Sequence, residues 1–156
     1  MSIKVDEAQL EENGRLAGIA IGTYALRSME RWRQNLTDYD CVMIITAVFA
    51  ISAERLLRSG VPAGSRRLDQ EIDRALLRKV NISSIAHATG LNRETARRKV
   101  NDLVEQGLLT RHEDGSIGIR LGLAQDDRIC DQVRAQVTEI AAVANQLIKI
   151  GVLSEG

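Results

Sequence analysis

Apolar residues recur at three- and four-residue steps through much of the chain, which predicts a mainly α-helical protein. Between residues 10 and 36 the apolar positions at these steps are Leu16, Ile19, Leu26, Met29, Trp32 and Leu36. Gly14, Gly18 and Gly22 fall every fourth residue in this stretch, and each costs a helix interior about 1 kcal/mol relative to Ala. Either another helix approaches closely along this row, or Gly14 breaks an early turn and Gly22 marks a bend.

A second helix is predicted to start at Thr37 or Asp38 and to end near Arg58, just before Ser59-Gly60. It is apolar all round for three turns, which predicts a buried central helix, with a ligand-lining role as the alternative. The stretch 61–66 holds the only proline and reads as a linker. A third helix is expected over 68–80, with its buried stripe on Leu68, Ile72, Ala75 or Leu76, and Val80.

Residues 81–107 predict two short helices joined by a tight turn. Ser83 or Ser84 can cap the first helix, which runs to Thr89. Gly90 stands where such a turn needs a positive φ, and Asn92 can cap a second helix that runs to about Gln106 and stops at Gly107. One stripe of this helix is apolar or small, at Ala96, Val100, Leu103 and Gly107. The remaining face displays Arg93, Glu94, Arg97, Arg98, Lys99 and Asn101.

After Gly107 the period changes from helix to strand. Residues 108–112 and 117–120 flank Asp114-Gly115, which predicts a β-hairpin. Helix, turn, helix with a basic outer face, and hairpin follow one another in the order of a winged helix-turn-helix. The predicted fold is therefore mainly α: a three-helix core with a hairpin wing over 67–122, preceded by a helical region over 1–66 and followed by a long C-terminal helix within 123–156.

The charged residues bear on the function only when the net charge is counted segment by segment along the chain. The 21 basic and 21 acidic side chains cancel, and taken alone this argues against a nucleic-acid partner. Residues 1–73 hold nine basic and eleven acidic side chains (−2), 74–120 hold nine and five (+4), and 121–156 hold three and five (−2). The basic excess therefore coincides with the predicted winged module, which is a weak indication of a polyanionic partner.

The segment 74–120 resembles the DNA-binding domain of bacterial winged-helix transcription regulators. The run 92–98, Asn-Arg-Glu-Thr-Ala-Arg-Arg, is similar to the recognition helix of the catabolite activator/Fnr family. That resemblance implies base reading by Arg93, Glu94 and Arg98. The chain departs from the family because its upstream region is helical, so no cyclic-nucleotide effector is implied. In size and layout it looks more like the MarR family of small dimeric regulators, with more residues before the motif and fewer after it.

Groove chemistry supports these roles independently. An arginine at the start of a helix in the major groove can contact guanine O6 and N7 together, and a carboxylate accepts from the cytosine amino group. We therefore expect base reading by Arg93, Glu94, Arg97 and Arg98. Contacts to the DNA backbone are expected from Ser83, Ser84, Asn92, Thr95, Lys99, Arg111 and His112, although for Lys99 a solvated helix face is slightly preferred.

A long helix without Pro or Gly is predicted over 124–150. A near-heptad seam runs along it, through Ile129, Val133, Val137, Ile140, Ala144 and Leu147. The seam can pack within the chain or pair with a second protomer. We favour a homodimer built from the terminal helices, because winged-helix readers usually bind two half-sites.

Other classes find little support. No phosphate-cradling glycine loop or nucleophile elbow appears, so no enzyme activity and no cofactor are expected. Two scattered cysteines and two scattered histidines predict neither a disulfide framework nor a metal site, and His87 is expected at a surface or cap position. The longest apolar run has 11 residues, too few for a membrane span, and no leader is recognised, so a cytoplasmic regulator is expected. Two alternatives stay open: a winged-helix module for protein–protein contact, and a small-molecule effector that no motif identifies.

Overall fold

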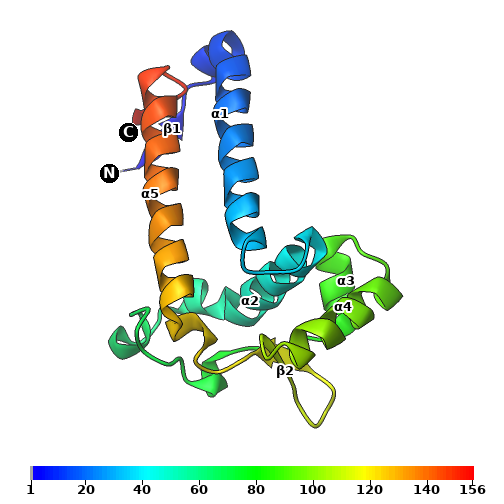
Figure 1. Cartoon of the computed structure of the whole chain (residues 1–156). Helices are drawn as coiled ribbons and strands as arrows, with labels where there is room; N and C mark the ends of the chain where they lie inside the picture. The colour runs from blue at the N-terminus through cyan, green and yellow to red at the C-terminus, as the bar shows by residue number, and fades with distance from the viewer. Residues whose placement is uncertain (1) are drawn as a thin grey trace. The chain divides into compact units, whose positions relative to one another are not determined.

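The computed structural model describes residues 2–156, except for the side chain of Ser59 (Figure 1). Within this range it contains five α-helices and two two-stranded antiparallel sheets, which confirms a mainly α-helical chain. The chain divides into two units. One is made of the residues up to Gln34 together with Asp131–Gly156, and the other of Asn35–Cys130.

The first unit is a helical hairpin closed by a small sheet. It contains β1 (Ile3–Val5), α1 (Glu7–Arg33), most of α5 (Asp127–Lys149) and β4 (Leu153–Glu155). The strands β1 and β4 pair antiparallel, with Ile3 opposite Glu155. The helices also run antiparallel, since Asn13 donates to the Ile150 carbonyl and Gln136 donates to the Ser28 hydroxyl. The buried apolar cluster of this unit is small: Ala17, Leu147 and Val152.

Helix α1 is continuous through its glycines. Asp6 caps it by accepting a 3.0 Å hydrogen bond from the Gln9 amide, and the helix passes Gly14, Gly18 and Gly22 without a break. The alternative in which Gly14 breaks an early turn is therefore wrong. A Cβ built on any of the three glycines meets no atom within 4 Å, so no other part of residues 2–156 uses the row for a close approach.

The predicted seam of α5 divides between two environments. Leu147 is buried against Ala17 within the chain, whereas Val137 and Ile140 are 61% and 51% exposed. Ile129, Val133 and Ala144 are half-buried. The seam therefore packs on α1 at one end and leaves its central side chains open to solvent.

The second unit has helix α2 at its centre. Helix α2 (Tyr39–Ser59) begins after Asp38, whose carboxylate accepts from the Cys41 amide at 3.0 Å, and ends at Gly60 with φ of 74°. Both ends agree with the sequence prediction. The helix packs on α3 (Ile82–Thr89), on α4 (Arg93–Glu105) and on β3 (Ile117–Ile119), which pairs with β2 (Leu109–Arg111). Together these elements bury Cys41, Ile44, Val48, Val80, Ile85, Val100, Leu103, Leu109 and Ile117.

Two predictions for this unit are wrong. No α-helix forms over 68–80, where the structure has one 3-10 turn at Arg74–Leu76 and Leu68 is exposed. Val80 is extended and exchanges backbone hydrogen bonds with Ile117. This pairing requires an extended backbone at Val80, so a helix cannot continue to this residue. Helix α2 packs on α3 and α4 instead. It is also not buried all round, because its contacts use one face and leave Phe49 and Leu57 exposed.

The bounds of the units also differ from the expected division at 66/67 and 122/123. Helix α2 joins the hairpin and the short helices in one unit, and α1 and α5 form the other. Both cysteines are free and buried. Among the described residues no helix is long and apolar enough to cross a bilayer.

Truncation of the core of the second unit tests this packing. Leu103 is fully buried and Leu57 is 94% exposed, and both lie on helices of the same unit. We expect Leu103→Ala to lower the free energy of unfolding by about 2–5 kcal/mol, because it removes transfer energy and leaves a cavity. Leu57→Ala should change it by no more than about 0.5 kcal/mol. Urea denaturation followed by circular dichroism measures both, and equal losses would contradict the packing.

Candidate nucleic-acid interface

Helices α3 and α4 are joined by a three-residue turn whose geometry is fixed locally. Asn81 caps α3, with its side-chain oxygen accepting from the Ser84 amide at 2.8 Å. The expected caps Ser83 and Ser84 are therefore wrong, because both lie inside the first turn of α3. Gly90 has φ of 72°, as the tight turn predicted, and Leu91 packs against the core.

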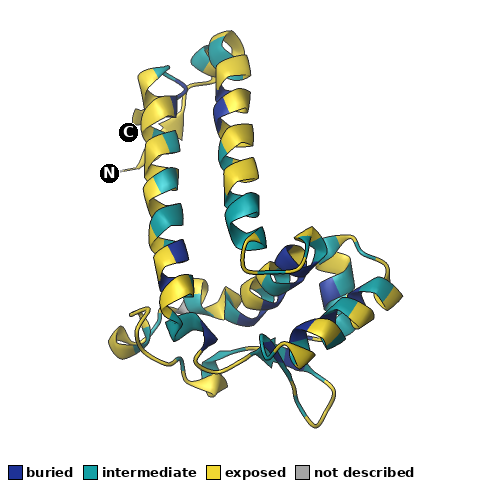
Figure 2. Cartoon of the chain, in the orientation of Figure 1, coloured by how far each residue is buried: buried dark blue, intermediate teal, exposed yellow. Residues whose placement is uncertain are grey.

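Helix α4 begins and ends where the sequence indicated. Asn92 accepts a 2.8 Å hydrogen bond from the Thr95 amide, and the chain leaves the helix through Gly107 with φ of 71°. The stripe Ala96, Val100 and Leu103 has no solvent exposure. Figure 2 shows buried and exposed positions alternating along α4. Burial of this stripe sets the rotation of α4 about its own axis, so the opposite side chains must face solvent.

The first two turns of α4 carry four charged side chains, and all four are exposed: Arg93, Glu94, Arg97 and Arg98. Asp102 and Glu105, farther along the helix, are exposed as well. Arg97 Nη2 lies 2.6 Å from Glu94 Oε1, one helical turn away. This hydrogen bond, together with the charge of Arg97, lowers the pKa of the Glu94 carboxyl. Glu94 is therefore ionised at neutral pH and offers only acceptors to a ligand.

Lys99 turns away from this face. Its ammonium forms an ion pair with Asp38, the residue that caps α2, and its side chain is only 17% exposed. The hydrogen bond between Lys99 and Asp38 lowers the pKa of the Asp38 carboxyl, and the same hydrogen bond raises the pKa of the Lys99 ammonium. The structure thus places Lys99 between α4 and α2, where it joins the two helices instead of facing outward.

The hairpin is held at its turn by contacts to Asp114. Asp114 accepts from the amide and hydroxyl of Ser116, and Lys79 Nζ lies 2.6 Å from Asp114 Oδ2. These hydrogen bonds hold the pKa of Asp114 well below its ordinary value, and the hydrogen bond from Lys79 has the largest effect. Gly115 has φ of 80°, which the tight turn requires. The hairpin predicted over 108–120 is confirmed as a two-stranded antiparallel pair.

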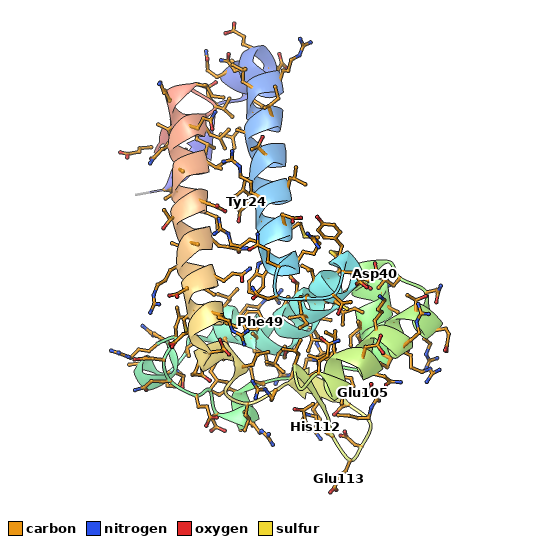
Figure 3. The ribbon with its side chains drawn as sticks, viewed as in Figure 1. Tyr24, Asp40, Phe49, Glu105, His112 and Glu113 are labelled. Carbon is orange, nitrogen blue, oxygen red and sulfur yellow. The ribbon has the colours of Figure 1, made fainter. Side chains whose placement is uncertain are left out.

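The two expected backbone-contact residues of the hairpin differ in exposure. Arg111 is exposed, and its guanidinium donates to Asn101 Oδ1 of α4 at 2.6 Å. His112 is half-buried over Gly118, where an added Cβ would lie 2.9 Å from His112 Nε2. The exposed Glu113 occupies the tip (Figure 3). The tip of the hairpin is therefore acidic, and its positive charge lies nearer to α4.

An open hollow of about 530 Å³ lies at the start of α3. Ser83 and Ser84 border it together with Arg78, Lys79 and His87. Arg78 and Lys79 belong to the basic segment 74–120, but nothing in their spacing links them to α3, so the sequence predicts no site role for them. Here the first turn of a helix, two hydroxyls and Arg78 share one surface, a combination suited to a phosphate group, although Lys79 is paired with Asp114 and the Glu54 carboxylate also borders the hollow.

The remaining chemistry is sparse. Among the residues that the structure describes, no group of three or more His, Cys, Asp or Glu side chains could hold a metal ion. Burial raises the pKa of the Cys41 thiol to about 11, so the thiol stays protonated at neutral pH and is a poor nucleophile. No family model, no curated protein and no solved structure matches this chain.

The Asp38–Lys99 pair predicts a pH-dependent stability. The pKa of Asp38 is lowered in the folded state, so its contribution is present above the unfolded carboxyl pKa and is lost as pH falls through the folded value. We expect Asp38→Asn, which keeps the cap, to destabilise the protein by about 0.2–1 kcal/mol at neutral pH. The difference from wild type should vanish in acid.

Denaturation midpoints measured across acidic and neutral pH test this. Glu113→Gln at the exposed hairpin tip serves as the control and should follow the wild-type profile. A gap between Asp38→Asn and wild type that persists in acid would show that the ion pair is not its source.

Proposed function

We propose that the chain is a sequence-specific, double-stranded-DNA-binding transcription regulator with a winged helix-turn-helix. In this proposal α4 enters the major groove, the hairpin β2–β3 is the wing, and the protein acts in the cytoplasm as a homodimer. In this proposal α2 is the third helix of the winged-helix core, a place that the sequence had assigned to the segment 68–80.

The outer face of α4 is the observation that carries the proposal. Four charged side chains are exposed at the start of a helix whose opposite stripe is fully buried. Among the described residues Arg93 and Arg98 make no hydrogen bond or ion pair, so their guanidinium groups are available to a ligand. A rigid helix that offers free arginines from its first two turns is well suited to reading base edges.

Each residue of the face has a distinct expected role. Arg93 and Arg98 would donate to guanine O6 and N7, and the ionised Glu94 would accept from a cytosine amino group. Arg97 is paired with Glu94, so it would orient that carboxylate as well as add positive charge. Binding would therefore use the Glu94–Arg97 pair as one unit.

Contacts to the DNA backbone would come from the hollow at the start of α3 and from the base of the wing. Ser83, Ser84 and Arg78 border the hollow. Arg111 would supply the wing contact, oriented by Asn101. Lys99 contributes less in this proposal than the sequence suggested, because its ammonium is engaged by Asp38.

A second candidate function is a winged-helix module for protein–protein contact. The acidic hairpin tip and the exposed apolar side chains of α2, Met43, Phe49 and Leu57, favour it. The two functions differ at Arg93 and Arg98, which DNA binding requires and which a partner protein docked on α2 would not touch.

Base reading predicts a loss of discrimination on arginine removal. We expect Arg93→Ala and Arg98→Ala each to reduce the preference for the best duplex over a point-mismatched duplex by about 10- to 100-fold, the equivalent of ~1–3 kcal/mol. Fluorescence anisotropy with both duplexes at one fixed salt concentration measures this ratio. Arg58→Ala, at an exposed position of α2, is the matched control and should leave the ratio unchanged. If this affinity ratio is unchanged in all three variants, α4 is not the element that reads the base sequence.

Backbone contact predicts a different signature. Arg111→Ala should weaken binding to all duplexes by the same factor and reduce the slope of log affinity against log salt by about 0.9. Titrations at several salt concentrations measure the slope. If Arg111→Ala instead changes the ranking of duplexes at constant slope, Arg111 reads bases and the wing assignment fails.

A further inference from the structure

The charge of α4 changes sign along the helix. Its first two turns carry three exposed arginines and one carboxylate, and that carboxylate is already paired with Arg97. Farther along, Asp102 and Glu105 are exposed, and the last turn holds no basic residue. The helix dipole has the same polarity, because it is positive at the N-terminus and negative at the C-terminus. Helix α4 therefore offers a positive end and a negative end to a polyanion.

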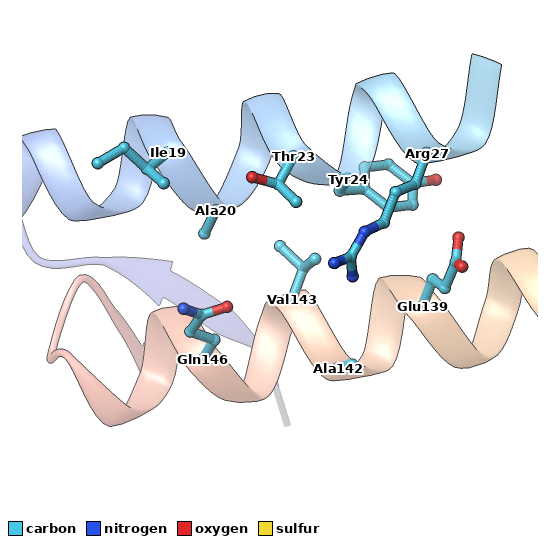
Figure 4. A pocket seen from close by; sticks show the side chains of 9 residues that line it. All are labelled: Ile19, Ala20, Thr23, Tyr24, Arg27, Glu139, Ala142, Val143 and Gln146. Carbon is cyan, nitrogen blue, oxygen red and sulfur yellow. The ribbon is translucent and has the colours of Figure 1, made fainter. Parts of the chain in front are cut away.

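The two acidic side chains at the negative end have no counter-charge. Among the described residues, neither Asp102 nor Glu105 takes part in an ion pair or a side-chain hydrogen bond. Carboxylates on other helices are compensated by arginines. On α2, Glu54 pairs with Arg58. On α5, Glu139 pairs with Arg31 and also borders, with Arg27, the hollow between α1 and α5 (Figure 4).

The hairpin adds a third uncompensated carboxylate. Glu113 is exposed and has no partner among the described residues, whereas the adjacent Asp114 is paired with Lys79. Figure 3 shows Glu105 at the end of α4 and Glu113 at the tip of the hairpin. The cation of the hairpin, Arg111, donates instead to the middle of α4. We name Asp102, Glu105 and Glu113 the acidic border.

The helical period places one residue of the border in line with a proposed base-reading residue. At 100° per residue, Arg98 and Glu105 lie on the same stripe, opposite the buried stripe of α4. If α4 lay flat in the groove, Glu105 would face the DNA as directly as Arg98. If α4 enters with its N-terminus, Glu105 stays about 10 Å farther back along the axis, close to one Debye length at 0.1 M salt. Repulsion from the phosphates is then largely screened in the second arrangement and much less so in the first.

We propose that the acidic border determines specificity by repulsion: it restricts DNA to the first two turns of α4 and the base of the hairpin, and disfavours every other docking of the duplex. This inference rests on the proposed DNA-binding function and concerns the same surface. A non-specific complex samples many orientations, and in many of them the border meets phosphates. The border therefore penalises wrong complexes more than the specific one, which is discrimination against competitors.

Removal of the repulsion should strengthen binding to the wrong DNA. Glu105→Gln keeps the shape of the side chain and removes its charge. At low salt we expect it to raise the affinity for an unrelated duplex about 3- to 10-fold, but the affinity for the best duplex by no more than about 2-fold. The preference for the best duplex should fall accordingly, and Glu113→Gln should act in the same direction. Fluorescence anisotropy with both duplexes at one fixed salt concentration measures these affinities.

Glu71→Gln is the matched control. Glu71 is exposed on the segment between α2 and α3, outside the border, and its substitution changes the net charge by the same amount. It should leave the preference between the two duplexes unchanged. Equal effects of Glu71→Gln and Glu105→Gln would show that net charge alone acts and would overturn the inference. A larger gain for the best duplex than for the unrelated one would also overturn it. Circular dichroism confirms that the variants fold.

The wild-type protein separates failure of this inference from failure of the proposed function. If wild type prefers one duplex and Glu105→Gln leaves that preference unchanged, the border has no role in specificity, although the DNA-binding function stands. If wild type retards no duplex at low salt, the DNA-binding function is wrong and this inference is overturned with it.

Discussion

Burial of one stripe of α4 is the constraint on which the remainder of the second unit depends. Ala96, Val100 and Leu103 are fully enclosed by α2, α3 and the hairpin. A helix whose stripe is enclosed in this way cannot rotate, so the side chains on its opposite face are presented in one fixed arrangement. The caps at Asn92 and Gly107 then limit its length, and the Lys99–Asp38 pair joins it to α2. The proposed reading face is thus a consequence of the core.

The sequence predicted those features that are determined locally. Some of these features depend on a positive φ and others on hydrogen bonds that span three residues or fewer. They are Gly90, Asn92, Gly107 and the Asp114-Gly115 turn, and each was found where expected. The bounds of α2 follow from the same kind of signal, an aspartate cap and a terminal glycine.

Features that depend on distant partners were predicted poorly. The stretch 68–80 has a helical pattern, but the pairing of Val80 with Ile117, 37 positions away, keeps its end extended. The expected burial of α2 on all sides failed because the available partners cover one face. The β1–β4 sheet was missed, since two three-residue strands at opposite ends of the chain leave no recognisable pattern. Within the candidate site, Arg78 and His87 could be placed beside Ser83 only once the fold was known.

The distribution of ion pairs refines the electrostatic argument. The basic excess of the central segment is partly internal: Lys99 is engaged by Asp38, Lys79 by Asp114, and Arg97 by Glu94. In the proposed function, sequence-independent attraction to DNA should therefore be modest, and most of the affinity should depend on a few free arginines and on two-fold symmetry. A chain without net charge can bind DNA selectively in this way.

Selection of bound duplexes from a random library, at a stated salt concentration, tests the central claim most directly. The account predicts enrichment of a two-fold symmetric site whose half-sites lie about one helical turn apart. Guanines should be preferred at the positions that Arg93 and Arg98 reach. The preference at the corresponding position should disappear when Arg93→Ala or Arg98→Ala is used in the selection. A pool that shows no enriched sequence after repeated rounds, with no retardation of any duplex at low salt, would contradict the account.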